Sequence, residues 1–182
     1  MSLRLNRKMW AAALAVWGLL TTPAETLDNR VDLALVLAID VSYSVDSAEH
    51  QLQMQGFGAA LQSPEVLAAI YKGKYQRIAV TVYQWSDATN QRIIVPWSMI
   101  ASEDDARKLG DVLAAGRRIV KEGGTAISAA LLFGADLFAS APAAERKVID
   151  LATDGRNNIG RPAREAKDVV LAQGITINGL AI

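Results

Sequence analysis

The chain has 182 residues, and its 19 basic and 19 acidic side chains leave no formal net charge. This length is enough for one domain with a single core and does not support two domains. The balanced charge argues against nucleic acid or an anionic membrane as a partner. The chain has no cysteine, which excludes a disulfide framework and is consistent with a domain that is stable by burial alone.

The N-terminus has the order of features that is typical of a secretory signal. Basic residues within the first eight positions precede an apolar run over 9–20, and the small residues of "TTPAE" follow. This run is too short to cross a bilayer as a helix. We predict that residues 1–24 are a signal peptide cleaved near Ala24 and that residues 25–30 are a short linker, with an uncleaved lipid-facing anchor as the alternative. Cleavage would remove three basic and no acidic residues, which leaves a formal charge of −3 on an exported protein, periplasmic or secreted, without a stable membrane span.

The first half of the mature chain alternates between apolar strands and helical patterns. Residues Val31–Ile39 ("VDLALVLAI") form an almost unbroken apolar run, as expected of a central parallel strand covered on both faces. A turn cluster, "SDATN", joins two further strands in a predicted hairpin, and Pro96 is expected to end the second of them. The elements predicted in this half are a strand over 31–39, a helix over 47–61, a short helical piece from Pro64, and strands over 77–85 and 91–95.

The second half continues the same alternation. Ser102 with Asp105 three positions later predicts a helix start, and "EGGT" ends that helix. The remaining predicted elements are a helix from Ala126, a strand over 147–153, a helix over 162–173 and a strand over 175–182. This order predicts an α/β fold over 31–182, with a doubly wound, mostly parallel sheet that has helices on both faces. Because no helix pattern follows the last strand, we expect either a C-terminally truncated fold or an open edge that something else covers.

Following the chain direction through these elements brings three polar loops to the same edge of the sheet. The first strand, the helix before "EGGT" and the fourth strand all end at the carboxyl edge, where doubly wound folds bind their ligands. Taken alone, each loop has a simpler interpretation as a helix cap or a turn. Together they offer only oxygen donors, which favour Mg²⁺, with Mn²⁺ or Ca²⁺ as alternatives, over zinc or copper. The candidate metal ligands are Asp40, Ser42, Ser44, Thr125 and Asp154.

These residues resemble the metal-ion-dependent adhesion site (MIDAS) of von Willebrand factor type A (VWA) domains. The pattern of that family is Asp-x-Ser-x-Ser after the first strand, a Thr in a glycine-led loop and an Asp after the fourth strand, here "DVSYS", "GGTAISAAL" and "LATDGRNN". The resemblance covers residues 31–182 and is closest to an uncharacterised family of secreted bacterial VWA-like proteins. Two departures are Tyr43, where the family often has Gly, and the lack of the family's last strand and final helix.

The resemblance implies a protein-binding domain without catalytic activity. A divalent cation at the site would take a Glu or Asp carboxylate from a partner protein. Two alternatives stay open at this point. One is a Mg²⁺-dependent phosphohydrolase with Asp40 as nucleophile, although Ser42 stands where a second acid is usual and is a poor general acid. The other is a structural secreted domain whose site has decayed, for which Tyr43 is the one hint.

Five further residues carry weaker predictions. The lone His50 is expected at the surface or at the boundary of the core, without a partner. Trp85 and Trp97 are expected to pack in the core or at the sheet edge. Asn157 and Asn158 follow the last candidate ligand, and they are expected either to cap the next helix or to hydrogen-bond waters of the site.

Overall fold

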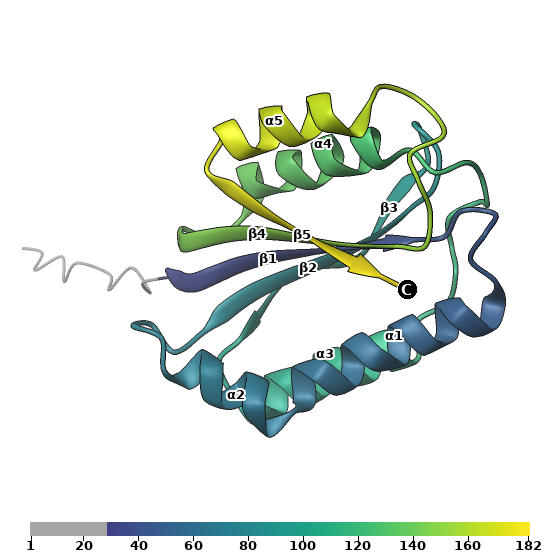
Figure 1. Ribbon diagram of the computed structural model, residues 1–182. Helices are drawn as coiled ribbons and strands as arrows, with labels where there is room; N and C mark the ends of the chain where they lie inside the picture. Colours follow the sequence, from purple (N-terminus) through teal and green to yellow (C-terminus); the bar gives the residue numbers. More distant parts are fainter. Residues whose placement is uncertain (1–28) are drawn as a thin grey trace, which may run out of the picture.

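The computed structural model describes residues 29–182, which form one five-stranded sheet in the order β3-β2-β1-β4-β5 (Figure 1). The predicted signal peptide lies outside the described residues. All neighbouring strands are parallel except β2 and β3, which pair antiparallel. The strands are β1 (Val31–Asp40), β2 (Ile78–Trp85), β3 (Gln91–Ile100), β4 (Ala144–Thr153) and β5 (Ile175–Ala181).

Helices cover both faces of this sheet. Figure 1 shows α1, α2 and α3 on one face and α4 and α5 on the other. The helices are α1 (Ser47–Gln62), α2 (Pro64–Tyr71), α3 (Glu103–Ala114), α4 (Ile127–Leu137) and α5 (Ala163–Ala172). The predicted doubly wound α/β fold is therefore confirmed. Within residues 29–182, no helix is long and apolar enough to cross a membrane.

The central strand β1 is buried on both faces of the sheet. Its side chains alternate between two cores: Leu37 and Ile39 pack on the α1 side, whereas Val36 and Ala38 pack on the α4 side. All four are buried. Because both faces are covered, the strand is apolar at almost every position, as predicted for a central parallel strand. Its end is thereby held rigidly at the carboxyl edge of the sheet.

Helix α1 begins directly after the loop that follows β1. Its N-cap is Asp46, whose Oδ1 accepts hydrogen bonds from the backbone N–H groups of Ala48 at 2.7 Å and Glu49 at 2.8 Å. The Glu49 carboxylate in turn accepts from the Asp46 N–H at 2.9 Å, which completes a capping box. These bonds satisfy N–H groups of the first turn and fix the point at which the loop becomes a helix.

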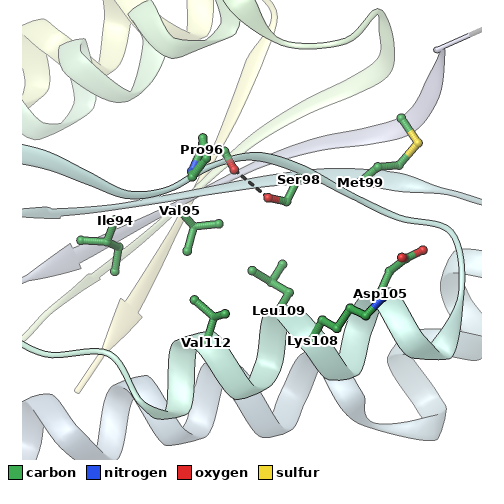
Figure 2. A pocket seen from close by; sticks show the side chains of 9 residues that line it. All are labelled: Ile94, Val95, Pro96, Ser98, Met99, Asp105, Lys108, Leu109 and Val112. Atoms are coloured by element: carbon green, nitrogen blue, oxygen red, sulfur yellow. Dashed lines mark hydrogen bonds between the residues drawn. The ribbon is translucent and has the colours of Figure 1, made fainter.

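The prediction that Pro96 ends the third strand is wrong, because β3 continues to Ile100. The strand lies at the edge of the sheet, where proline is tolerated, and its register with β2 shifts between Val80 and Val82. Figure 2 shows β3 above α3, with the Ser98 hydroxyl donating to the Pro96 carbonyl at 2.9 Å. The Thr81 hydroxyl also donates to the Val95 carbonyl at 2.8 Å, so side chains bond main-chain carbonyls around the irregularity.

The prediction for His50 is also wrong. This residue is 4% exposed, and its Nε2 lies 3.1 Å from Nε2 of Gln84, which is buried on β2. His50 lies on the side of α1 that faces the sheet. Because a buried polar ring needs a hydrogen-bond partner, its contact with Gln84 compensates for its loss of water. The packing prediction for the two tryptophans is confirmed: Trp85 is fully buried, and Trp97 is partly buried and donates its indole N–H to the Leu137 carbonyl at 3.1 Å.

Candidate metal site

Three loops meet at the carboxyl edge of the sheet, at the right-hand end of Figure 1. Strands β1 and β4 are parallel neighbours, with Ile39 opposite Ala152, so the residues that end or follow them emerge side by side. The third loop, over 115–126, joins α3 to α4. The convergence that was predicted by following chain direction is therefore present in the structure.

Asp40 is the most deeply placed of the candidate residues, with a fully buried side chain. Its Oδ1 accepts from the Ser42 N–H at 2.7 Å, and its Oδ2 accepts from the Thr153 hydroxyl at 2.6 Å. Burial raises the pKa of Asp40, and the charge of Asp154 raises it further, while the bonds from Thr153 and Ser42 act in the opposite direction.

Two serines connect the loop after β1 to the loop after β4. The Ser42 hydroxyl is 1% exposed and lies 3.3 Å from the Ser44 hydroxyl. The Ser44 hydroxyl then donates to Oδ1 of Asp154 at 2.8 Å, across 110 positions of sequence. Ser44 and Asp154 are exposed, so the site has a buried side at Asp40 and an open side toward solvent.

Thr125 reaches the same place from the third loop. Its side chain is 3% exposed and packs against Gly155, where an added Cβ would lie only 3.2 Å from the Thr125 Oγ1. A side chain at position 155 would therefore be tight against Thr125, and one of the two would have to shift by a few tenths of an ångström. The simpler interpretation of Thr125 as a helix cap does not hold, because Ala126 is the N-cap of α4 and makes no capping hydrogen bond with its side chain. Thr125 thus lies beside Gly155, the immediate neighbour of Asp154.

The two asparagines after Asp154 hold the start of α4. Asn158 Oδ1 accepts from the Thr125 N–H at 2.8 Å, and the Asn158 N–H donates to the Thr125 carbonyl at 2.9 Å. Asn157 Oδ1 accepts from the Ser128 N–H in the first turn of α4 at 3.3 Å. Neither residue caps the helix that follows in sequence. They act instead across the site, clamping the Thr125 loop to the loop after β4.

The loop over 115–126 has little regular secondary structure but is well anchored. Gln84 Oε1 accepts from the N–H groups of Ile119 at 2.8 Å and Val120 at 3.3 Å, and the Ser86 hydroxyl donates to the Lys121 carbonyl at 2.8 Å. The Tyr43 N–H donates to the Gly123 carbonyl at 2.9 Å. These contacts, like that of Thr153 with Asp40, were not predicted, because sequence patterns do not pair a strand side chain with a distant loop.

The donor chemistry of the site fits a hard divalent cation. Within residues 29–182, no group of three or more His, Asp or Glu side chains is placed to hold a metal ion. The five candidate residues instead offer two carboxylates and three hydroxyls, all oxygen donors. Burial is the main cause of the raised pKa of Asp40, and the negative charge of Asp154 adds to it. A cation between the two carboxylates would offset that negative charge.

The sheet, its two helical layers and the three loops at its carboxyl edge define a VWA-like domain. The chain belongs to the DUF1194 family, described as proteins of unknown function, whose family model matches residues 30–182. No curated protein matches the chain in sequence. The predicted family resemblance is therefore confirmed at the level of fold and family.

Solved structures of other proteins share the fold. Proximal thread matrix protein 1 from the mussel byssus has a TM-score of 0.63 and 20% identity, over 82% of this chain and 38% of that chain. Another structure of it, described as having a zinc-occupied MIDAS motif, has a TM-score of 0.61 and 21% identity over the same shares. The von Willebrand factor type A structure from Catenulispora acidiphila has a TM-score of 0.56 and 21% identity, over 82% of this chain and 33% of that chain. The chain thus spans well under half of these proteins.

Proposed function

We propose that this protein is an exported binding domain that engages an acidic group of a partner protein through a divalent cation. The proposed ligands are Asp40, Ser42, Ser44, Thr125 and Asp154. The observation that carries the proposal is the hydrogen-bonded path from buried Asp40 through Thr153 to the loop of Asp154, closed on the other side by the bond from Ser44 to Asp154. Oxygen atoms from residues 113 and 110 positions apart in the sequence are thus held together at the carboxyl edge of the sheet.

The charge of the site explains why a partner would be acidic. Two carboxylates at most neutralise a divalent cation, and the three hydroxyls donate weakly. When bound, such an ion would offer an open, electron-poor position to an anionic group. Mg²⁺ prefers six oxygen ligands and the protein offers five side chains, so water or a partner carboxylate would complete the set. Mg²⁺ is the proposed ion, with Mn²⁺ or Ca²⁺ as alternatives; zinc is an outcome that the metal titration below also tests.

The hydrolase alternative lacks a second acid beside Asp40. Ser42 stands where that acid is usual and is a poor general acid. Its hydroxyl lies 3.3 Å from another hydroxyl, that of Ser44. Export, which the basic and apolar order of the N-terminus supports, places the proposed partner in the periplasm or outside the cell.

Metal-dependent stabilisation is the first test. Ligand that binds only the folded state stabilises it by about 2.7 kcal/mol at a concentration of 100 times its Kd. We expect Mg²⁺ to raise the midpoint of thermal unfolding, and Asp154→Asn to abolish that rise. Asp168→Asn, an exposed carboxylate on α5, is the matched control and should respond like the wild type. If zinc but not Mg²⁺ raises the midpoint, zinc replaces Mg²⁺ as the proposed ion. If no divalent ion raises it, the metal site is refuted and a structural domain with a decayed site is favoured.

A pull-down from the exported fraction is the second test. The partner should be captured in Mg²⁺ and released by EDTA, and Asp154→Asn should fail to capture it. Capture that is equal in EDTA would contradict binding through a shared ion, even if the metal itself binds.

A further inference from the structure

A shallow hollow of about 450 Å³ adjoins the candidate metal site. Its lining residues are Tyr43, Arg118, Ile119, Val120, Lys121 and Glu122. Tyr43 lies between the two serines of the site in sequence, so one lining residue of the hollow belongs to the same loop as two candidate ligands. The proposed metal site gives a role to Ser42 and Ser44 but none to Tyr43 or to the residues over 118–122 that line the rest of the hollow.

Two large apolar side chains in this hollow are turned toward solvent. Tyr43 is 72% exposed and Ile119 is 60% exposed. Exposed apolar groups beside a binding site are a feature of protein contact surfaces, in which a few such anchors contribute most of the affinity.

The backbone that carries these two side chains is fixed. The Tyr43 N–H donates to the Gly123 carbonyl at 2.9 Å, and the Ile119 N–H donates to the buried Gln84 Oε1 at 2.8 Å. A partner that contacts them therefore loses little free energy to ordering the loops, which is the usual cost of binding to a mobile segment.

The charges in the hollow favour an acidic partner. The Arg118 guanidinium pairs with Glu122 and also donates to the Val45 carbonyl, so it serves the loop itself. Its side chain is only 16% exposed. Lys121 is exposed, and it leaves the hollow with one positive charge in excess of the Arg118–Glu122 pair. This charge complements a segment that carries an Asp or Glu.

We propose that the hollow is a subsite for an aromatic or aliphatic side chain that lies next to the carboxylate bound at the metal. The proposal rests on the proposed function and adds the partner's chemistry: an acidic residue flanked by an apolar one. Tyr43 and Ile119 act as the two walls that grip the apolar group, and Lys121 adds attraction at the rim.

Small carboxylates test this subsite without knowledge of the partner. Acetate carries only the metal-binding group, whereas 3-phenylpropionate adds an aromatic ring at a short distance. Both are titrated against the protein in saturating Mg²⁺, with backbone amide chemical shifts as the readout. We expect 3-phenylpropionate to bind about tenfold more tightly, as expected for partial burial of one ring, and to shift the amides of Tyr43 and Ile119.

Variants separate the subsite from the metal. Tyr43→Ala and Ile119→Ser should each bring the affinity ratio of the two carboxylates close to one while leaving acetate binding unchanged. Leu52→Ser removes an equally exposed apolar side chain on α1 and should leave the ratio as in the wild type.

The outcomes distinguish this proposal from the one on which it rests. If both carboxylates bind with equal affinity, or if 3-phenylpropionate binds as well in EDTA, the subsite is overturned while metal binding stands or falls by its own test. If neither carboxylate binds although Mg²⁺ stabilises the fold, the open coordination position is lacking and both proposals fail. If Mg²⁺ itself does not stabilise the fold, the metal site is refuted, and the subsite, which is defined beside a metal-bound carboxylate, fails with it.

Discussion

The hydrogen bond from Thr153 to Asp40 offers a sharp test of how the site is held together. The Thr153 hydroxyl donates to Oδ2 of a fully buried carboxylate at 2.6 Å. Thr153→Val removes this donor and keeps the shape of the side chain. The carboxylate oxygen would then be left in a dry environment without its partner, which costs more than the loss of an ordinary surface hydrogen bond.

The size of the effect follows from the charge of the acceptor. Hydrogen bonds to charged groups contribute about 1.5–3 kcal/mol, whereas those between neutral groups contribute about 0.5–1.5 kcal/mol. Thr81→Val is a matched control, because the Thr81 hydroxyl donates to a neutral acceptor, the Val95 carbonyl, at 2.8 Å. We expect Thr153→Val to lower the free energy of unfolding by about 2 kcal/mol and Thr81→Val by about 1 kcal/mol.

Urea unfolding in EDTA at neutral pH measures both costs, provided that the dependence of stability on urea is unchanged. A double-mutant cycle with Asp40→Asn then isolates the pair, because Thr153→Val should cost less when the acceptor has lost its charge. The reasoning is refuted if Thr153→Val costs no more than Thr81→Val, or if its cost is the same with Asp40→Asn. Saturating Mg²⁺ should recover part of the loss in Thr153→Val and none in Thr81→Val.

Three further predictions concern the scaffold around the site. Gly58→Ala should destabilise the fold by about 1–3 kcal/mol in urea unfolding, because an added Cβ would lie 2.6 Å from the Gly110 carbonyl oxygen where α1 crosses α3; an unchanged midpoint would contradict this close contact. Asp46→Ala should cost about 1 kcal/mol through loss of the α1 capping box, whereas Asp46→Asn should retain most of the stability. Burial, together with the nearby Arg118 charge, lowers the pKa of His50 below its ordinary value of 6.5, so the unfolded chain takes up the proton first and stability is lost as the pH falls below about 6.5. His50→Gln should flatten the fall in unfolding free energy between about pH 8 and pH 5, and an unchanged slope would assign the loss to other groups.

The topology could be predicted because it depends on local patterns and on counting chain direction. The apolar run of β1 and the polar residues after it mark where the chain reaches the carboxyl edge. Each later reversal follows from the alternation of strand and helix. This is sufficient to bring Asp40 and Asp154 to one place, since their strands are parallel neighbours. It does not require knowledge of any side-chain contact.

Side-chain partners could not be predicted in the same way. His50 lies on α1, a helix that buries polar residues such as Gln53 along with apolar ones, so the sequence pattern did not mark its inward face. Its partner Gln84 is 34 positions away on β2. Pro96 was misjudged for a related reason, because only the position of β3 at the sheet edge makes a proline acceptable there.

In the loop over 115–126, different parts of the chain can serve cation binding and partner selection. Its main chain is bonded by side chains of β2: Gln84 accepts from two of its N–H groups and Ser86 donates to one of its carbonyls. Bonds to the main chain hold the loop whatever its own side chains are, provided that they remain outside the core. Substitution of Ile119 can therefore alter the contact with a partner without moving Thr125. It follows that the affinity for the cation depends on inward contacts, whereas the choice of partner depends on outward side chains.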